Sequence, residues 1–323
     1  MIHRIQTGVA GFVTPYKECP SRLYTTLDTM NYILYCPAIS FLVLSLAGCG
    51  LFPKTVKVGS KNTTAQMIVG EITAQHLESK STFQIVRRLG MGNTALVHQA
   101  TLSRDVDIYP EDTGTAIAAM LKENPIQDPE SQWERIRNEY DRIYGLRVLR
   151  PLGAGNSSVA VVSEALANKE NLTNLSSAVE SKVQWRIGVT EDFAERTDGL
   201  STFGSRYKMQ QKEAARTMDA TALYQALRDR QVDMILGGES DGMLATPGLR
   251  LLADDKHIFA PGQLCLLARR DTLESTAGLE AALSQLSGKL STEALRLMGK
   301  EVEVDKRPLA DVARDFLKKA GLH

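Results

Sequence analysis

The sequence predicts an α/β fold in which a second lobe is inserted into the first. Short apolar runs typical of strands alternate, from residue 55 onward, with stretches that have the three- and four-residue spacing of amphipathic helices. Such an order favours sheets covered by helices. The stretch 147–155 begins as a strand and continues into a glycine- and proline-punctuated crossing, and the apolar strand 264–268 is expected to cross back.

The first lobe is expected to begin with alternating strands and helices. Strands are predicted at 56–58 and 83–86, and each precedes a helical pattern. Asn93 or Thr94 is expected to cap the second helix, because both side chains can accept an amide hydrogen. The helix stripes are Ala65, Ile68, Ile72 and Leu77, then Leu96, Val97 and Ala100. This βαβα order predicts a largely parallel sheet.

Residues 105–121 are predicted to form a strand followed directly by a helix, and the rest of the chain is expected to be organised around this unit. Val106 and Ile108 alternate with aspartates, which indicates a strand with one buried face. Tyr109 and Pro110 are expected to end it, because proline cannot donate to the ladder. Residues 112–115, Asp-Thr-Gly-Thr, then open a helix over the apolar run 116–121. A helix N-terminus after a strand can hold a small anion, although an ordinary capped turn is the alternative.

Later elements follow the same logic. A charged helix is expected to pack on the stripe of Trp133, Ile136, Tyr140 and Ile143. The second lobe is expected to contain strands at 159–162, 185–189 and 232–236, a helix capped by Thr190, and a helix with the apolar face Ala222, Leu223, Ala226 and Leu227. Helices around 279–286, 292–298 and 309–319 are expected to complete the first lobe.

One group of motifs carries a family resemblance. Residues 109–115, Tyr-Pro-Glu-Asp-Thr-Gly-Thr, resemble the signature of substrate-binding proteins of ABC importers for glycine betaine, carnitine, choline and related osmoprotectants. Other matches follow in the family's order over roughly residues 56–322: 58–61, 89–94, 192–200, 231–235, 240–242, 254–256, 312–317 and 321–322. Each motif is weak alone, and their shared order carries the resemblance.

The resemblance implies a type II periplasmic-binding-protein-like clamshell that binds a small solute between two lobes. The expected domains are residues 50–155 and 262–323 for the first lobe and 156–261 for the second. Expected partners are the solute and the permease and ATPase subunits of an ABC importer, with no cofactor or metal. Lys plus Arg equals Asp plus Glu at 38 each, so no global positive field attracts nucleic acid.

The resemblance also assigns a binding site. Lys61 and Thr115 match positions that hold a ligand carboxylate from the first lobe, and Arg196 matches the arginine that reaches it from the second. A guanidinium and a hydroxyl at a helix N-terminus suit a carboxylate. Each side chain could instead be a surface cation or a cap.

The other half of the family's site is altered. Relatives enclose a quaternary ammonium in tyrosines, whereas the matching positions here are Asp112, Ser158, Gly238 and Gly262. Tyr109 remains nearby and Glu239 lies beside one cage position. We therefore expect a zwitterion whose cationic or polar end hydrogen-bonds at Asp112, with the two glycines opening volume. The alternative is that Asp112 only caps its helix and that Tyr207 or Tyr224 supplies relocated aromatics.

Residues 1–49 are interpreted as a leader. The apolar run 32–46 is followed by Ala-Gly-Cys49, which resembles a lipobox whose cysteine is lipidated. The run is short for a membrane span, and Met30 is a possible later start. Cys19 and Cys36 would leave with the leader, so Cys265 could form no internal disulfide and is expected to be buried. The protein is then expected on the outer face of the cytoplasmic membrane or in the periplasm.

Two competing functions stay open. An enzyme is disfavoured because the histidines are scattered and no nucleophile–base pair has supporting spacing; His98 beside apolar Val97 is expected to be structural. A sensory domain that keeps the fold without transporting is the other alternative.

Overall fold

A computed structural model describes residues 54–80, 82–259 and 261–322, all within one compact unit, Gly50–His323. The interpreted signal peptide, the possible start at Met30 and the lipidation residue Cys49 lie outside the described residues. Within the described part, no helix is both long and apolar enough to cross a membrane.

The first lobe is built on a five-stranded sheet of order β2-β1-β3-β10-β4. Its strands are β1 Lys54–Gly59, β2 Phe83–Arg88, β3 Ile108–Asp112, β4 Leu146–Val148 and β10 Leu264–Arg269. Its helices are α1 Thr64–Glu78, α2 Thr94–Leu102, α3 Thr113–Thr115, the π-helical turn η1 Ala116–Met120, α4 Pro129–Tyr144, α10 Arg270–Ser275, α11 Leu279–Ser284, α12 Thr292–Glu303 and α13 Leu309–Ala320.

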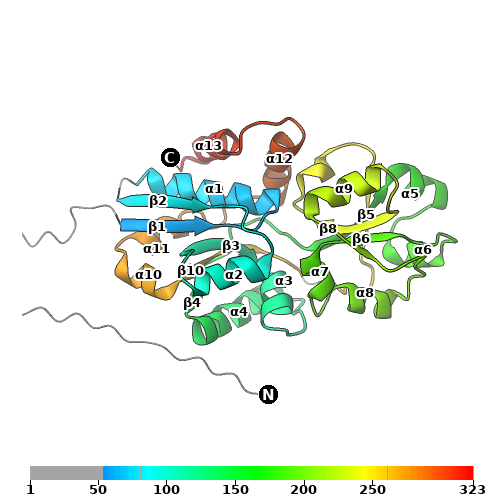
Figure 1. Cartoon of the computed structure of the whole chain (residues 1–323), viewed down its shortest axis with the longest axis horizontal. Helices are drawn as coiled ribbons and strands as arrows, with labels where there is room; N and C mark the ends of the chain where they lie inside the picture. The colour runs from blue at the N-terminus through cyan, green and yellow to red at the C-terminus, as the bar shows by residue number, and fades with distance from the viewer. Residues whose placement is uncertain (1–53, 81, 260, 323) are drawn as a thin grey trace, which may run out of the picture. The chain divides into compact units, whose positions relative to one another are not determined.

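The second lobe has its own five-stranded sheet, of order β7-β6-β8-β5-β9. Its strands are β5 Ser158–Ser163, β6 Ile187–Val189, β7 Arg216–Thr217, β8 Met234–Gly238 and β9 Leu249–Leu252. Its helices are α5 Glu164–Glu170, α6 Leu175–Glu180, α7 Glu191–Glu195, α8 Leu200–Tyr207, α9 Ala220–Arg228 and the 3₁₀ turn η2 Gly242–Ala245. Figure 1 shows the two sheets as separate bodies, with both ends of the described chain in the first. The inserted-lobe fold is therefore confirmed, while the residue at which each lobe begins stays a prediction.

The prediction of a largely parallel first sheet is wrong for half of it. β1 runs parallel to β2 and β3, but β10 pairs antiparallel with both β3 and β4. The cause is the second crossing, because β10 returns from the other lobe and enters the sheet in the opposite direction.

The strand in the organising stretch begins where we expected it to end. β3 starts at Ile108 and continues through Tyr109 and Pro110, and all of its residues are buried. The carbonyl of Asp107 accepts the amide of Arg269 in β10, and the amide of Thr113 donates to Gln263 just before it, so the backbone groups of the odd-numbered residues face that strand. The nitrogen of Pro110 then faces β1, which pairs with β3 only at Ile108. Proline is tolerated because no ladder bond is required there.

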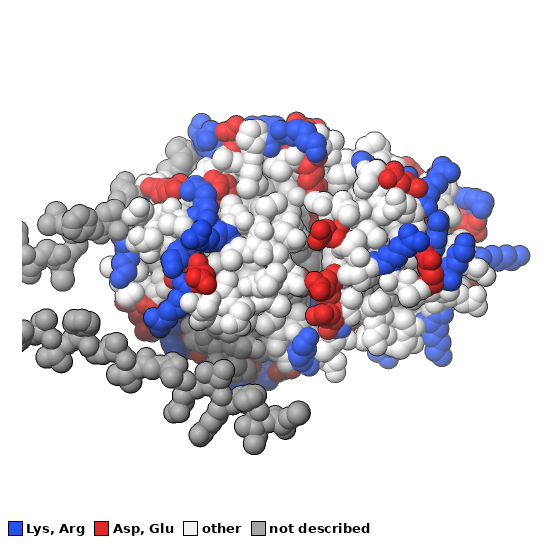
Figure 2. Space-filling model, in the orientation of Figure 1, with Lys and Arg blue, Asp and Glu red and all other residues white. Residues whose placement is uncertain are grey.

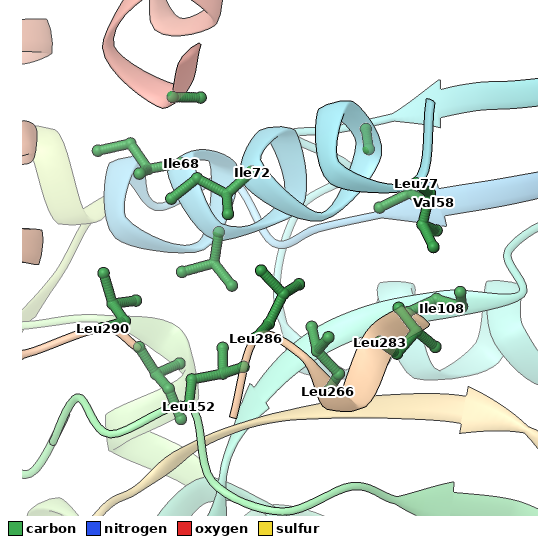
Figure 3. Close-up of a cluster of buried hydrophobic side chains, with 14 of the residues drawn as sticks. Val58, Ile68, Ile72, Leu77, Ile108, Leu152, Leu266, Leu283, Leu286 and Leu290 are labelled. Carbon is green, nitrogen blue, oxygen red and sulfur yellow. The ribbon is translucent and has the colours of Figure 1, made fainter. Parts of the chain in front are cut away.

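The core of the first lobe joins distant parts of the chain. Figure 3 shows Ile68 and Ile72 of α1 above Leu152, Leu266 and Leu286, with Leu290 beside them. Full burial of each such side chain contributes roughly 1.5–3 kcal/mol. The C-terminal helices are therefore structural parts of the lobe that carries the organising stretch. On α4, Trp133, Ile136 and Tyr140 are buried as expected, but Ile143 is 48% exposed.

The two lobes meet at a glycine contact beside the chain crossings. A Cβ on Gly242, in η2, would lie 2.2 Å from the carbonyl carbon of Gly299, in α12. A Cβ on Gly299 would lie 2.8 Å from Cα of Gly242. The two backbones can approach so closely only because neither residue has a side chain.

We predict that Gly242→Ala lowers the free energy of unfolding of residues 50–323 by about 1–3 kcal/mol, because the added methyl group overpacks this contact. Urea titration followed by circular dichroism measures the change. Gly204→Ala is the matched control: nothing lies within 4 Å of its Cβ position on α8. It is expected to stabilise by about 0.5–1 kcal/mol. Equal effects of the two substitutions would contradict the proposed role of the contact.

Candidate binding site between the lobes

A cavity of about 90 Å³ lies between the two lobes. Five of the predicted site residues line it: Lys61, Asp112 and Thr115 from the first lobe, and Ser158 and Arg196 from the second. The remaining lining consists of Thr63, Ala65, Asn156, Thr190, Asp192, Phe193, Ala220, Leu223, Leu236, Gly237, Gly238 and Asp241.

A wider opening of about 520 Å³ continues from this cavity. The two spaces share Thr63, Thr190, Asp192 and Ala220. The described lining of the opening includes Glu191, Asp192 and Asp219 and no lysine or arginine. Acidic side chains also lie along the boundary between the lobes in Figure 2. The path to the cavity is therefore negatively charged.

Lys61 lies in a buried ion cluster rather than unpaired in the cavity. Its Nζ donates to Glu111 Oε1 at 2.6 Å, to Asp112 Oδ2 at 3.4 Å and to the Thr94 hydroxyl at 3.2 Å. These acceptors use all three ammonium hydrogens. Burial alone would lower the pKa of Lys61, but the carboxylates of Glu111, Asp112 and Asp192 raise it, so the lysine stays charged.

Glu111 is the least satisfied member of the cluster. It is fully buried, its Oε1 also accepts the amide of Asp112 at 2.9 Å, and its Oε2 has no hydrogen-bond partner among the described residues. Burial raises the pKa of Glu111 to about 7, against the lowering effect of Lys61. With a pKa in this range, Glu111 changes its protonation state near neutral pH.

Asp112 caps the helical segment that follows β3. Its Oδ1 accepts the amide of Thr115 at 2.8 Å, as expected for an N-cap. Its other oxygen faces Lys61, and the residue lines the cavity. Burial would raise the pKa of Asp112, but Lys61, Arg196 and the Thr115 bond hold it below its ordinary value. Capping and cavity lining are therefore compatible.

Arg196 reaches the first lobe from the end of α7. Its guanidinium forms a two-bond pair with Asp198, at 2.7 and 2.6 Å, and Nη1 donates to the Thr115 hydroxyl at 3.1 Å. A second contact between the lobes joins Asp192 to Thr94, whose amide and hydroxyl both donate to that carboxylate. Each lobe therefore provides hydrogen-bond partners for some polar groups of the other.

Two predicted site residues lie away from the cavity. Tyr109 is fully buried in an apolar cluster with Trp133 and Tyr140, and its hydroxyl bonds to His98 Nδ1 at 3.0 Å. Glu239 does not line the cavity; its Oε1 accepts the amide of Ser157 at 2.9 Å. These bonds give both residues a structural role here.

The matched cage positions contain no aromatic ring, and they are only partly brought together. Ser158 and Gly238 are direct partners across β5 and β8, and both line the cavity. Gly262 does not line it, and a Cβ there would meet the Asn156 backbone at 2.8 Å. The expectation that Gly262 opens volume is therefore wrong, because the crossing chain occupies that space.

Aromatic side chains are scarce around the cavity. Among the residues that the structure describes, Phe193 is its one aromatic lining residue. The rings of Tyr207 and Tyr224, considered above as relocated aromatics, do not line it. Their hydroxyls bond to Asp254 at 2.5 Å and to Asp241 at 2.8 Å.

Sequence reasoning missed several lining residues, above all Asp241, Asn156 and Phe193. Asp241 and Phe193 stand inside motifs that carried the resemblance, Ser-Asp-Gly at 240–242 and residues 192–200. Their place in these motifs is the sequence signal that could have identified them. Asn156 gave none, because a single asparagine in a glycine-rich crossing is typical of a turn.

Other reactive groups have structural surroundings. His98 is buried, and burial lowers its pKa to about 4. Cys265 is fully buried as expected, and burial raises the pKa of its thiol. Among residues 54–80, 82–259 and 261–322, no group of His, Cys, Asp and Glu is arranged to hold a metal ion.

The raised pKa of Glu111 predicts a pH dependence of stability. The native state keeps this proton above the pH at which the unfolded chain has lost it. The stabilisation is therefore complete below about pH 4.3 and is lost as pH rises through about 7. Because Glu111→Gln removes this titration, its stability relative to the unsubstituted protein should rise by about 2 kcal/mol between pH 5 and 7.5.

Urea unfolding of both proteins at each pH measures that difference. His98 titrates in both proteins, so its contribution cancels in the subtraction. A difference that does not change with pH would contradict the pKa assigned to Glu111.

Known proteins resemble this chain over most of its length. Residues 54–319 match the family described as the substrate binding domain of ABC-type glycine betaine transport system. A carnitine transport binding protein of Listeria monocytogenes is 31% identical over 278 residues, which cover 85% of this chain and 90% of that protein. An ergothioneine transport permease/ergothioneine binding protein of Helicobacter pylori is 27% identical over 302 residues, 93% of this chain and 53% of that protein.

A solved structure supports the same assignment. The crystal structure of a glycine betaine/carnitine/choline ABC transporter protein superposes with a TM-score of 0.69 at 25% identity. The match covers 83% of this chain and 99% of that one. The shared fold, the matched length and the sequence identity lead to one conclusion: the chain belongs to the substrate-binding proteins of the glycine betaine-type ABC transporter family.

Proposed function

We propose that this substrate-binding protein delivers a small zwitterionic solute to the permease and ATPase of an ABC importer. The observation that carries the proposal is the described cavity lining, which combines the cations Lys61 and Arg196 with three aspartates and one aromatic ring: Asp112, Asp192, Asp241 and Phe193. Such a surface complements a solute that carries both signs of charge and hydrogen-bonding groups. Binding without catalysis follows from the same proposal.

The carboxylate end of the solute is assigned to Arg196, Thr115 and Lys61. Arg196 and the Thr115 hydroxyl already meet across the cavity. For Lys61, the longest of its three contacts is the one to Asp112, at 3.4 Å. A ligand carboxylate could replace that contact without breaking the 2.6 Å bond to Glu111.

The cationic end is expected to carry N–H groups, with Asp112 and Ser158 as acceptors. A trimethylammonium cannot donate hydrogen bonds and gains about 0.5–2 kcal/mol from each aromatic face, and only Phe193 is available among the described lining residues. This supports loss of the aromatic cage. A glycine betaine or choline receptor with relocated aromatics is the alternative, and a sensory role on the same fold stays a further prediction.

A thermal-shift screen of residues 50–323 tests the proposal. Betaines, choline and carnitine are compared with amino acids, guanidino acids and polyamines, because a ligand of the native state raises the unfolding midpoint. Shifts by amine- or guanidinium-bearing acids are expected. A shift by quaternary ammonium solutes alone would favour the alternative, and chemical conversion of a bound solute would contradict a purely binding role.

Asp112→Asn is predicted to weaken binding of an amine-bearing acid by about ten-fold or more, because a charged hydrogen bond is worth about 1.5–3 kcal/mol. Asparagine can still cap the helix, so the substitution removes charge and keeps the cap. Calorimetric titration measures the affinity, and urea unfolding checks that stability is retained. Unchanged affinity would show that Asp112 acts only as a cap.

We also propose that Cys49 is lipidated and holds the protein at the outer face of the cytoplasmic membrane. The support is the apolar run 32–46 that leads to Ala-Gly-Cys49. Cys49→Ser is predicted to abolish incorporation of labelled fatty acid into the full-length chain. In a detergent phase-partitioning experiment, the substituted protein is expected in the aqueous, detergent-poor phase. Cys36→Ser is the matched control within the leader. Continued labelling of the Cys49 variant would contradict the anchor.

A further inference from the structure

Asp241 is a lining residue for which neither the sequence nor the family match provided a role. It follows β8, and its Oδ2 accepts the Tyr224 hydroxyl at 2.8 Å and the amide of Gly238 at 2.9 Å. These two bonds fix the orientation of the carboxylate. No donor among the described residues bonds to its other oxygen, Oδ1.

No described lysine, arginine or histidine forms an ion pair with Asp241. The other lining carboxylates are matched within the protein: Asp112 pairs with Lys61, and Asp192 accepts the amide and hydroxyl of Thr94. Arg296 is the cation that acts on Asp241 from outside the cavity, but its hydrogen bonds go to the carbonyl of Glu239. Burial accordingly raises the pKa of Asp241. Within the described residues, Arg296 therefore acts on this carboxylate only from a distance, and no cation bonds to it directly.

Gly238 leaves this carboxylate uncovered. A Cβ at Gly238 would lie 3.1 Å from Asp241 Oδ1 and 2.7 Å from Asn156 Oδ1, and all three residues line the cavity. Any larger side chain at this position would separate the two oxygens from the cavity. Glycine therefore leaves Asp241 Oδ1 uncovered, beside Asn156 Oδ1, which already accepts the Ser240 hydroxyl at 2.6 Å.

The charge of the approach favours the same ligand. The neighbouring opening, which shares part of its lining with the cavity, is bordered by Glu191, Asp192 and Asp219. Low-dielectric walls of one sign concentrate an oppositely charged solute at the opening. The negative charge outside the cavity and the acceptor oxygens inside it thus both favour a cation that carries N–H groups.

We propose that Asp241, exposed by Gly238, is the acceptor for a cationic N–H group of the solute, an ammonium or a guanidinium, and that it sets specificity against quaternary ammonium ions. The inference rests on the proposed function for the zwitterionic nature of the solute. It adds a second-lobe anchor to the first-lobe residue Asp112. A trimethylammonium at this place would bury Asp241 Oδ1 without giving it a hydrogen-bond donor.

Calorimetric titration of residues 50–323 tests the proposal with four ligands: 4-aminobutyrate, 4-guanidinobutyrate, glycine betaine and methylammonium. Asp241→Asn is expected to weaken binding of the N–H cations by about 10- to 100-fold. Gly238→Ala keeps the charge but covers it, and it is expected to weaken the same ligands. Asp229→Asn is the matched control, because this exposed aspartate of the same lobe bonds only to Gln225 in the described part of the chain.

The outcomes separate the two proposals. If an N–H cation binds and Asp241→Asn leaves its affinity unchanged, the role of Asp241 is overturned while the zwitterion receptor stands. If methylammonium binds in an Asp241-dependent way but neither amino acid does, the anchor stands and the zwitterion proposal fails. Absence of binding by every N–H cation overturns the anchor. A crystal structure of a complex that places the cationic nitrogen away from Asp241 Oδ1 also overturns it.

Discussion

A buried ammonium must be matched by nearby acceptors, and in this protein that requirement falls on Lys61. The residue follows β1, and its partners Glu111 and Asp112 end β3, so one ion cluster links the ends of two neighbouring parallel strands. Breaking such a pair by removing one partner costs about 3–5 kcal/mol, because the other charge stays buried. The position of the cavity, the cap on the following helix and the contact to Thr94 all depend on this cluster.

The cluster also takes part in the hydrogen bonds that join the two lobes. Lys61 holds the Thr94 hydroxyl, whose own hydrogen goes to Asp192 of the second lobe, and Arg196 bonds to Thr115 in the opposite direction. Polar groups of each lobe thus find partners in the other. A solute must exchange these contacts for its own, so affinity reflects the difference between two well-bonded states rather than the sum of new bonds.

Most of the fold could be predicted from the sequence because helices and strands have distinct apolar periods, as in α1 and β5. The direction of β10 could not, since pairing depends on a return from another lobe that periodicity does not encode. The position of Pro110 could not be predicted either. Proline cannot donate a backbone hydrogen bond, but β1 pairs with β3 only at Ile108, so no such bond is required at Pro110. For the site, family positions identified Lys61, Thr115 and Arg196 as lining residues. Their partners Glu111 and Asp198, and the exposure of Asp241, depend on side-chain geometry that spacing does not determine.

The contact between Gly242 and Gly299 has a mechanical consequence. Two backbones that touch without side chains between them leave little room for sliding, but they permit rotation about the point of contact. Opening would then be a rotation of one lobe relative to the other about this contact. Asn156, whose Oδ1 accepts the Ser240 hydroxyl at 2.6 Å, lies near this contact and would move little. Groups close to this contact, Asp241 among them, would already be in position when a solute binds, before the other lobe closes over it.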